Sequence, residues 1–139
     1  MKKIVSASTN SMIIKTVRDA CRNSATFSCT VTGDTEGAVS FINFELPEIK
    51  VIDYTSSSID GDRILESIHN DSWLHYGGII AVCGSRAEVR ALEEKKDDNI
   101  LSALTVEDFK RHSKCRFGKD NFIDSVDFDY MEFQVLEED

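Results

Sequence analysis

The chain has 139 residues, of which 41% are hydrophobic and 29% are charged, with one proline and seven glycines. This balance predicts a single folded domain and excludes disordered and collagen-like chains. Residues 1–119 carry 17 acidic and 16 basic residues, whereas residues 120–139 carry eight acidic residues and no basic one. Because such a tail repels nucleic acid and anionic lipid, we expect neither as a partner.

Targeting and metal-binding signals are missing from the sequence. No apolar run approaches the roughly 18 residues of a membrane span, and the first residues lack the apolar stretch of a secretory signal, so we expect a cytoplasmic protein. The cysteines at 21, 29, 83 and 115 have no CxxC spacing, and the three histidines form no HExxH pattern. We therefore expect buried thiols at Cys21, Cys29 and Cys83 and no metal site.

The first half of the chain predicts two strand–helix units. A short β-prone run over 3–7 ends in a polar turn, and helical spacing of apolar residues predicts a helix over 11–23 with Ser11 as its N-cap. Residues 25–31 alternate apolar and polar side chains, as a strand with one solvated face does. A helix follows over 36–44, and Pro47 ends it.

The second half repeats this alternation. A third strand over 49–53 leads through a polar loop past Gly61 into a helix. The run over 79–83 is the most apolar in the chain and suits a central strand covered on both faces. A helix over 86–96, a strand over 100–104 and a last helix with Thr105 as N-cap complete the series.

Five strands alternating with five helices predict parallel βαβ units with right-handed crossovers. The expected fold class is therefore α/β, a doubly wound five-stranded parallel sheet in a (βα)5 three-layer sandwich, most simply of flavodoxin-like order. We expect this domain to span residues 1–117. Residues 118–139 form an acidic C-terminal extension, which either packs on the domain, begins a linker or further domain, or pairs between subunits.

Ligands of such sheets bind beyond the carboxyl ends of the strands, at the point where the strand order reverses. Six residues occupy these ends in the predicted fold: Ser8, Thr9, Asp53, Cys83, Gly84 and Ala103. Asp53 is the ionisable carboxylate of the set, so it is the strongest functional candidate. The alternative is an aspartate that ends a strand and caps a turn.

The stretch from Pro47 to Gly61 resembles the response-regulator receiver domains of two-component signal transduction. In that family a Pro-Asp pair and an apolar strand lead to the aspartate that accepts a phosphoryl group, and an Asp-Gly follows with its glycine eight positions later. Asp53 and Gly61 match this spacing, and Ser57 stands where the family has a proline. The resemblance covers residues 3–115 and implies that Asp53 is the phosphoacceptor candidate.

The other positions of the family's site depart from its pattern. Ser8 and Thr9 stand where the family has an acidic pair that holds Mg²⁺. Cys83 replaces a threonine or serine that bonds the phosphoryl group, and Ala103 replaces a lysine that pairs with it. Ile100 stands at the aromatic switch position. The resemblance therefore implies a degenerate pocket made of Ser8, Thr9, Cys83 and Ala103.

Phosphoryl transfer depends on neutralising charge with Mg²⁺ and a cation, and Mg²⁺ prefers several hard oxygen ligands. The sequence therefore predicts a pseudo-receiver, an atypical signalling domain that acts as a protein-interaction module and not as an enzyme, with no metal and no other cofactor. The alternative is a phosphorylatable receiver in a phosphorelay, which would use Asp53 and Mg²⁺.

An alternative from another class is a small flavodoxin-like cofactor-binding protein. The hydroxyl-rich turn over 6–11 precedes a helix N-terminus, where a phosphate could bind. That turn contains no glycine to let the backbone approach a phosphate, however. A hydrolase is disfavoured because the sequence has no GxSxG motif.

The expected partner is a protein, either a signalling kinase or an effector domain. Receivers commonly associate through the face formed here by the helix over 86–96, the strand over 100–104 and the last helix, so a homodimer through this face is one expectation. The basic residues of the region are Arg86, Arg90, Lys95, Lys96, Lys110, Arg111 and Lys114. They indicate a solvated face or a site for an acidic partner, including the chain's own tail.

Overall fold

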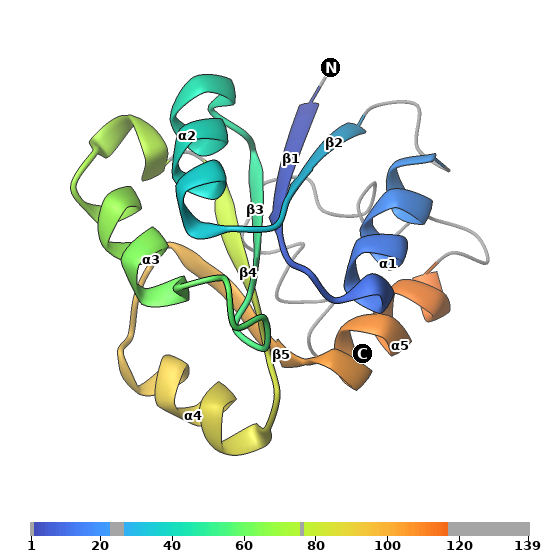
Figure 1. Ribbon diagram of the computed structural model, residues 1–139. Helices are drawn as coiled ribbons and strands as arrows, with labels where there is room; N and C mark the ends of the chain where they lie inside the picture. Colours follow the sequence, from blue (N-terminus) through green and yellow to red (C-terminus); the bar gives the residue numbers. More distant parts are fainter. Residues whose placement is uncertain (1, 23–26, 76, 117–139) are drawn as a thin grey trace.

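The computed structural model describes residues 2–22, 27–75 and 77–116, the last five of them as helix backbone only. Strands and helices alternate as the sequence predicts (Figure 1). They are β1 (Lys2–Ala7), α1 (Ser11–Arg22), β2 (Phe27–Thr32), α2 (Thr35–Glu45), β3 (Ile49–Asp53), α3 (Gly61–His69), the 3₁₀ helix η1 (Ser72–His75), β4 (Gly78–Cys83), α4 (Arg86–Glu94), β5 (Ile100–Thr105) and α5 (Val106–Arg116). The proposed extension at 118–139 and the interpretations of it lie outside the described residues.

The five strands form one parallel sheet in the order β2-β1-β3-β4-β5. This is the flavodoxin-like order, and it confirms the predicted fold class. The strand order reverses between β1 and β3, because the chain first adds β2 on one side of β1 and then returns to add β3 on the other. No helix in the described part of the chain is long and apolar enough to cross a membrane.

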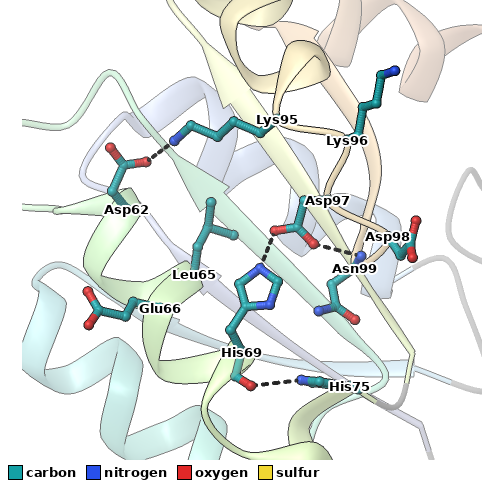
Figure 2. Close-up of a pocket in the computed structure, with 10 residues that line it drawn as sticks. All are labelled: Asp62, Leu65, Glu66, His69, His75, Lys95, Lys96, Asp97, Asp98 and Asn99. Atoms are coloured by element: carbon teal, nitrogen blue, oxygen red, sulfur yellow. Dashed lines mark hydrogen bonds and ion pairs between the residues drawn. The ribbon is translucent and has the colours of Figure 1, made fainter.

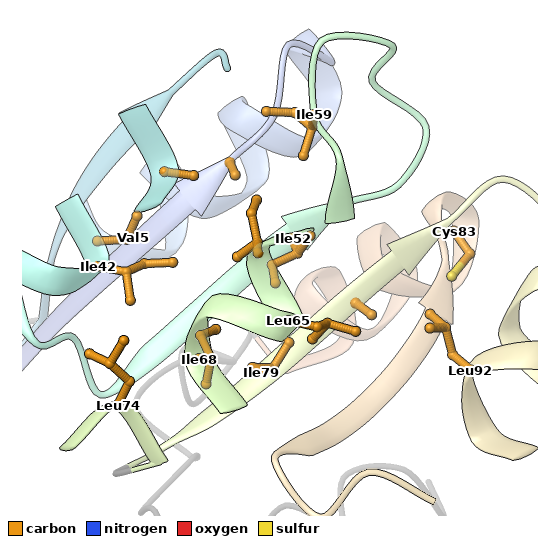
Figure 3. Packing of buried hydrophobic residues seen from close by; sticks show 14 residues of the cluster. Val5, Ile42, Ile52, Ile59, Leu65, Ile68, Leu74, Ile79, Cys83 and Leu92 are labelled. Atoms are coloured by element: carbon orange, nitrogen blue, oxygen red, sulfur yellow. The ribbon is translucent and has the colours of Figure 1, made fainter. Parts of the chain in front are cut away.

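Two hydrophobic clusters, one on each face of the sheet, make the three layers. The first lies under α1 and α5 and includes Val17 and Phe109, and the second lies under α2, α3 and α4 (Figure 3). Strand β4 is buried along its whole length and contributes to both clusters, with Val82 in the first and Cys83 in the second. The predicted central, doubly covered strand is therefore confirmed.

Side-chain caps set the helix starts, and one differs from the prediction. The Asn10 side-chain carbonyl accepts hydrogen bonds from the N–H groups of Met12 at 2.9 Å and Ile13 at 3.4 Å, so Asn10 rather than Ser11 is the N-cap of α1. Asparagine and serine are similarly good caps, so the sequence pattern alone does not choose between neighbours. The predicted cap of α5 is confirmed, since Thr105 Oγ1 accepts the Asp108 N–H at 3.2 Å.

A buried lysine in β3 holds the connection between α3 and β4. Lys50 is only 2% exposed, and its Nζ donates a hydrogen bond to the carbonyl oxygen of Leu74 in η1 at 2.8 Å. Burial lowers the pKa of Lys50 to about 8, against a smaller opposing effect of the Glu48 charge. Because a buried ammonium group is costly, the burial of Lys50 makes the stability of the fold depend on pH.

We expect Lys50 to contribute an increase in stability between pH 8 and pH 10 that the Lys50→Met variant lacks. Lysine has a pKa of 10.5 when unperturbed, so over this window the unfolded chain binds more protons than the folded one, and the free energy of unfolding rises with pH. Between pH 8 and pH 10 the difference amounts to about 2 kcal/mol. Urea unfolding of both proteins across this range measures it.

The comparison with the variant is needed because burial raises the pKa of Cys83 to about 11 and that of Tyr54 as well. These two groups make stability fall with pH in the same window, in both proteins. The difference between wild type and variant isolates Lys50. Parallel curves for the two proteins would contradict the assigned role.

Candidate functional site

The register of the sheet places Ser8 beside Asp53. Ala7 pairs with Ile52 across β1 and β3, so Ser8 and Asp53, which follow them in the chain, lie at the same level of the sheet. Both residues are at the carboxyl edge of the sheet, at the reversal of strand order where parallel sheets bind ligands. The structure therefore confirms that Ser8 and Asp53 come together, as the sequence predicts.

The Asp53 carboxylate is enclosed by three hydroxyl side chains. Its Oδ2 accepts hydrogen bonds from Ser8 Oγ and Ser56 Oγ, both at 2.6 Å. Its Oδ1 accepts from Thr55 Oγ1 at 2.6 Å and from the Thr55 N–H at 2.8 Å. The residue is 0% exposed. We call Ser8, Thr55 and Ser56 the hydroxyl cage of Asp53.

The cage is itself held by backbone groups of the turn after β1. Ser56 Oγ accepts hydrogen bonds from the N–H and the hydroxyl of Thr9, at 2.9 and 3.0 Å, and Ser8 Oγ accepts the N–H of Asn10 at 3.0 Å. Ser8 thus accepts one hydrogen bond and Ser56 accepts two, and the hydroxyl of each serine donates to the carboxylate. The loops after β1 and β3 are joined through this network.

The four hydrogen bonds fill the acceptor capacity of the carboxylate. An ionised carboxylate offers about four lone-pair sites, two on each oxygen. Each oxygen of Asp53 accepts two donors, which matches that capacity. Within the ranges that the structure describes, no basic side chain forms an ion pair with Asp53. The buried charge is therefore compensated by hydroxyl and amide dipoles.

Sequence reasoning did not identify two members of the cage, Thr55 and Ser56. The available signal was the Asx turn, in which an aspartate accepts the N–H two residues later, as Asp53 does with Thr55. Asp53 therefore does end a strand and cap a turn, which is the alternative that the sequence offered for it. It does not exclude a further role, because the side chain still lies at the ligand edge of the sheet.

The remaining candidate residues lie around this edge without contacting the carboxylate directly. Thr9 is exposed and reaches Asp53 only through Ser56, and Gly84 is exposed. Cys83 is 0% exposed and packs in the second hydrophobic cluster near Leu92 (Figure 3). Burial, with the charges of Glu88 and Asp53, raises the pKa of the Cys83 thiol to about 11.

Two residues of β5 complete the list of candidates. Ala103 is half-buried and lies against the second hydrophobic cluster. Ile100 pairs with Ile79, which itself stands beside Lys50, so Ile100 lies three residues before the level of Asp53. Neither residue offers a polar side chain to the carboxylate.

Gly61, whose spacing from Asp53 carries the family resemblance, has a steric role here. A Cβ at this position would lie 2.4 Å from the ring of Tyr54, the residue that follows Asp53. Only glycine therefore lets the tyrosine ring cover the start of α3. Burial and the negative charge of Asp62 raise the pKa of Tyr54.

The donor groups around Asp53 do not fit a magnesium ion. Mg²⁺ prefers octahedral oxygen ligands that include carboxylates, and here the carboxylate oxygens already accept four hydrogen bonds. The neighbours at the level of the site are the neutral hydroxyls of Ser8 and Thr9. No cluster of three or more His, Cys, Asp or Glu residues suited to a metal occurs in the described part of the chain.

A cavity of about 580 Å³ opens beside α3, away from Asp53 (Figure 2). Its walls come from α3, from His75 and from the segment 95–99 that leads into β5. His69 Nε2 contacts Asp97 Oδ2 at 2.7 Å, and Lys95 pairs with Asp62 at 3.1 Å. These contacts fasten the segment before β5 to α3, so the four side chains that make them already serve the fold.

A second cavity of about 350 Å³ lies between α4, β5 and α5, with Ala103 among its lining residues. Arg86, Arg90 and Arg111 surround it. Asp108 pairs with Arg111 at 2.6 Å and lies 3.8 Å from Arg86. This groove is the concave part of the basic face predicted from the sequence.

Comparison with solved structures identifies the fold. The Mn²⁺-bound response regulator Rcp1 matches with a TM-score of 0.63 and 18% identity, over 80% of this chain and 88% of that one. The phosphorylated cyanobacterial phytochrome response regulator RcpA matches with a TM-score of 0.63 and 17% identity, over 99% and 89%. A LuxR-family DNA-binding response regulator from Staphylococcus aureus matches with a TM-score of 0.62 and 14% identity, over 80% and 94%.

The chain therefore has the (βα)5 fold of response-regulator receiver domains, which confirms the fold that the resemblance implied. At these low identities the likeness concerns the fold alone. No protein-family model and no curated protein matches the sequence.

We expect Ser56→Ala to lower the free energy of unfolding by about 2 kcal/mol, because it leaves a buried carboxylate oxygen short of a donor. Ser57→Ala is the matched control, since Ser57 is the exposed neighbour in the same loop, and its effect should stay within about 0.5 kcal/mol. Urea denaturation measures both.

A double-mutant cycle tests whether the Ser56 effect acts through the charge. In an Asp53→Asn background, the loss caused by Ser56→Ala should shrink, because the hydrogen bond is no longer to an ionised group. Two results would contradict the role assigned to the hydroxyl cage. One is an equal loss of unfolding free energy for Ser56→Ala and Ser57→Ala, and the other is an unchanged loss for Ser56→Ala in the Asp53→Asn background.

Proposed function

We propose that the chain is a degenerate receiver domain, a pseudo-receiver, that acts in cytoplasmic signalling as a protein-interaction module. In this proposal it is not an enzyme, needs no cofactor and takes no phosphoryl group by the standard magnesium-dependent route. The observation that carries the proposal is the hydrogen bonding of Asp53, whose two carboxylate oxygens accept four donors in a site closed to solvent.

The chemistry of phosphoryl transfer supports this reading. An aspartate that attacks phosphorus must turn a free lone pair toward the donor, and the charge of the transferring group needs a metal and a cation. Here each oxygen already accepts two hydrogen bonds. The positions that the resemblance assigns to metal and cation carry Ser8, Thr9 and Ala103 instead.

The runner-up function is a phosphorylatable receiver that uses Asp53. Its support is the placement of Asp53 at the last residue of β3, at the strand-order reversal, with Gly61 eight residues later. In this reading the hydroxyl cage would open before the reaction. The two functions differ in one measurable event, the gain of a phosphoryl group.

The cofactor-binding alternative has less support. It needs the hydroxyl-rich turn after β1 to face a phosphate, but the Ser8 hydroxyl donates inward to Asp53, and that of Thr9 donates to Ser56. The helix that follows is capped by Asn10, which occupies the first free N–H groups of α1.

The proposed partners are a signalling kinase or an effector domain, or a second copy of the chain. The groove between α4, β5 and α5 favours an acidic surface, because Arg86, Arg90 and Arg111 outnumber its two acids, Glu93 and Asp108. Arg86 and Arg111 share the one carboxylate of Asp108 and are largely exposed, so the groove keeps an excess of positive charge for a partner.

We expect acetyl phosphate with Mg²⁺ to leave the intact mass of the protein unchanged, because Asp53 has no free acceptor site and no fitting metal ligands. The Asp53→Asn variant, treated in parallel, controls for modification elsewhere. A gain of one phosphoryl group in the wild type that is absent from Asp53→Asn would establish the runner-up function.

Self-association through the basic groove should weaken as salt rises from about 50 mM to 500 mM, because exposed charges are screened over shorter distances. The reversal Arg90→Glu should lower association at the low salt concentration. Arg63→Glu, a charge reversal on α3, is the matched control and should leave it unchanged. Sedimentation velocity measures the degree of self-association. Equal effects of the two charge reversals would show that the groove is not part of the interface.

A further inference from the structure

We propose that the acidic tail of the chain, residues 120–139, binds in the groove between α4, β5 and α5 of the same molecule. This inference rests on the proposed function for the role of the groove and deepens it, because it names the segment that covers the groove until a partner displaces it. The position of the groove, its charge, its apolar lining and the place where the described fold ends all support it.

The groove runs along the open edge of the sheet. β5 is the last strand in the order β2-β1-β3-β4-β5, so it has a neighbouring strand on one side only. Because α4 packs on the second hydrophobic cluster and α5 on the first, the space between these helices opens onto the outer edge of β5 (Figure 1). Five of the six residues of β5 are only half-buried, whereas β4 is buried throughout. Proteins commonly cover such a strand edge with another segment.

Arg90 gives the groove a positive charge that the described fold does not neutralise. Arg86 and Arg111 lie 3.8 and 2.6 Å from the carboxylate of Asp108, so they share one negative charge. Arg90 is exposed, and no carboxylate in the described part of the chain forms an ion pair with it. With Glu93 counted, the lining carries three positive and two negative charges. Charge complementarity therefore favours an acidic occupant.

Apolar side chains line the same groove. Val89, Ala103 and Leu104 belong to its walls, and all three are half-buried. A purely charged segment would leave their apolar surface partly in water, whereas a segment with apolar side chains would bury it. The groove therefore fits a segment that is both acidic and rich in apolar residues.

The tail has this composition. It carries eight acidic residues and no basic one, together with nine large apolar or aromatic residues: Phe122, Ile123, Val126, Phe128, Tyr130, Met131, Phe133, Val135 and Leu136. A second copy of the domain matches the groove less well, because residues 1–119 carry 17 acidic and 16 basic residues and have almost no net charge. The charge of the occupant therefore favours the tail over another domain.

The tail also begins close to the groove. Arg111 lines the groove, and α5 ends at Arg116, about 7.5 Å of helix later. Since α5 is about 16 Å long, a segment that returns beside it to the level of Thr105 needs about five of the 23 residues that follow Arg116. A segment tethered this closely has an effective concentration near millimolar, which exceeds that of a second copy in dilute solution.

The test uses the full chain with ¹⁵N-labelled arginine, at low salt and at a concentration where sedimentation velocity shows a monomer. The variant Asp127→Asn/Asp129→Asn removes two charges of the tail. We expect the side-chain N–H resonance of Arg90 to shift in this variant, while that of Arg63 on α3 stays unchanged. Raising the salt from about 50 mM to 500 mM should shift the Arg90 resonance of the wild type in the same direction, which needs no variant.

A protease that cuts after glutamate gives a second measurement, the rate of cleavage after Glu132. At low salt, Arg90→Glu should raise this rate at least about threefold, because cleavage follows the population in which the tail has left the groove. Adding Asp127→Lys and Asp129→Lys to Arg90→Glu should slow the cleavage again, since opposite charges then face each other. Arg63→Glu is the matched control and should leave the rate unchanged.

Three results would overturn the inference. They are no change at Arg90, an equal change at Arg63, and a change that occurs only at concentrations where the chain self-associates, which would place a second copy in the groove. These results would leave the proposed function standing. Uptake of a phosphoryl group at Asp53 would instead overturn the proposed function and leave the contact between tail and groove in place.

Discussion

The buried carboxylate of Asp53 determines what the ligand edge of this sheet can do. A negative charge removed from water must be compensated, and receiver folds that catalyse phosphoryl transfer would do so with a metal and a cation. Here the compensation comes from Ser8, Thr55 and Ser56, with one backbone N–H. Because these donors belong to the two adjoining loops, the carboxylate also joins those loops, which gives it a structural task whatever else it does.

The two hydrophobic clusters of the core do not include that site. They are built from side chains of opposite faces, and the strand order follows from the chain path. The features that set this chain apart lie at the margins of the core: the cage at one edge and the arginine groove beside β5. A fold whose stability is supplied by its core can lose a reaction and keep a surface that others recognise.

The alternation of elements, the strand order and the juxtaposition of Ser8 with Asp53 were predictable, because periodicity, βαβ handedness and parallel register determine them. The cage was only partly predictable. Thr55 and Ser56 stand in a loop that reads as generic polar sequence, and their side-chain directions follow from a local turn around Asp53. Lys50 was missed for a similar reason: its burial depends on η1, a short element with no periodic pattern, whose Leu74 carbonyl meets the ammonium group.

The network around Asp53 also couples two stretches of backbone that are 45 or more residues apart. The Thr9 N–H ends on Ser56, the Asn10 N–H ends on Ser8, and the Thr55 N–H ends on the carboxylate itself. Ser56 and Ser8, which accept from the first two amides, both donate to the carboxylate that accepts from the third, so all three amides are linked through Asp53. The two loops therefore share a single local opening event, and their amide hydrogens should exchange with solvent deuterium at matched rates, as one cooperative unit at the end of the sheet.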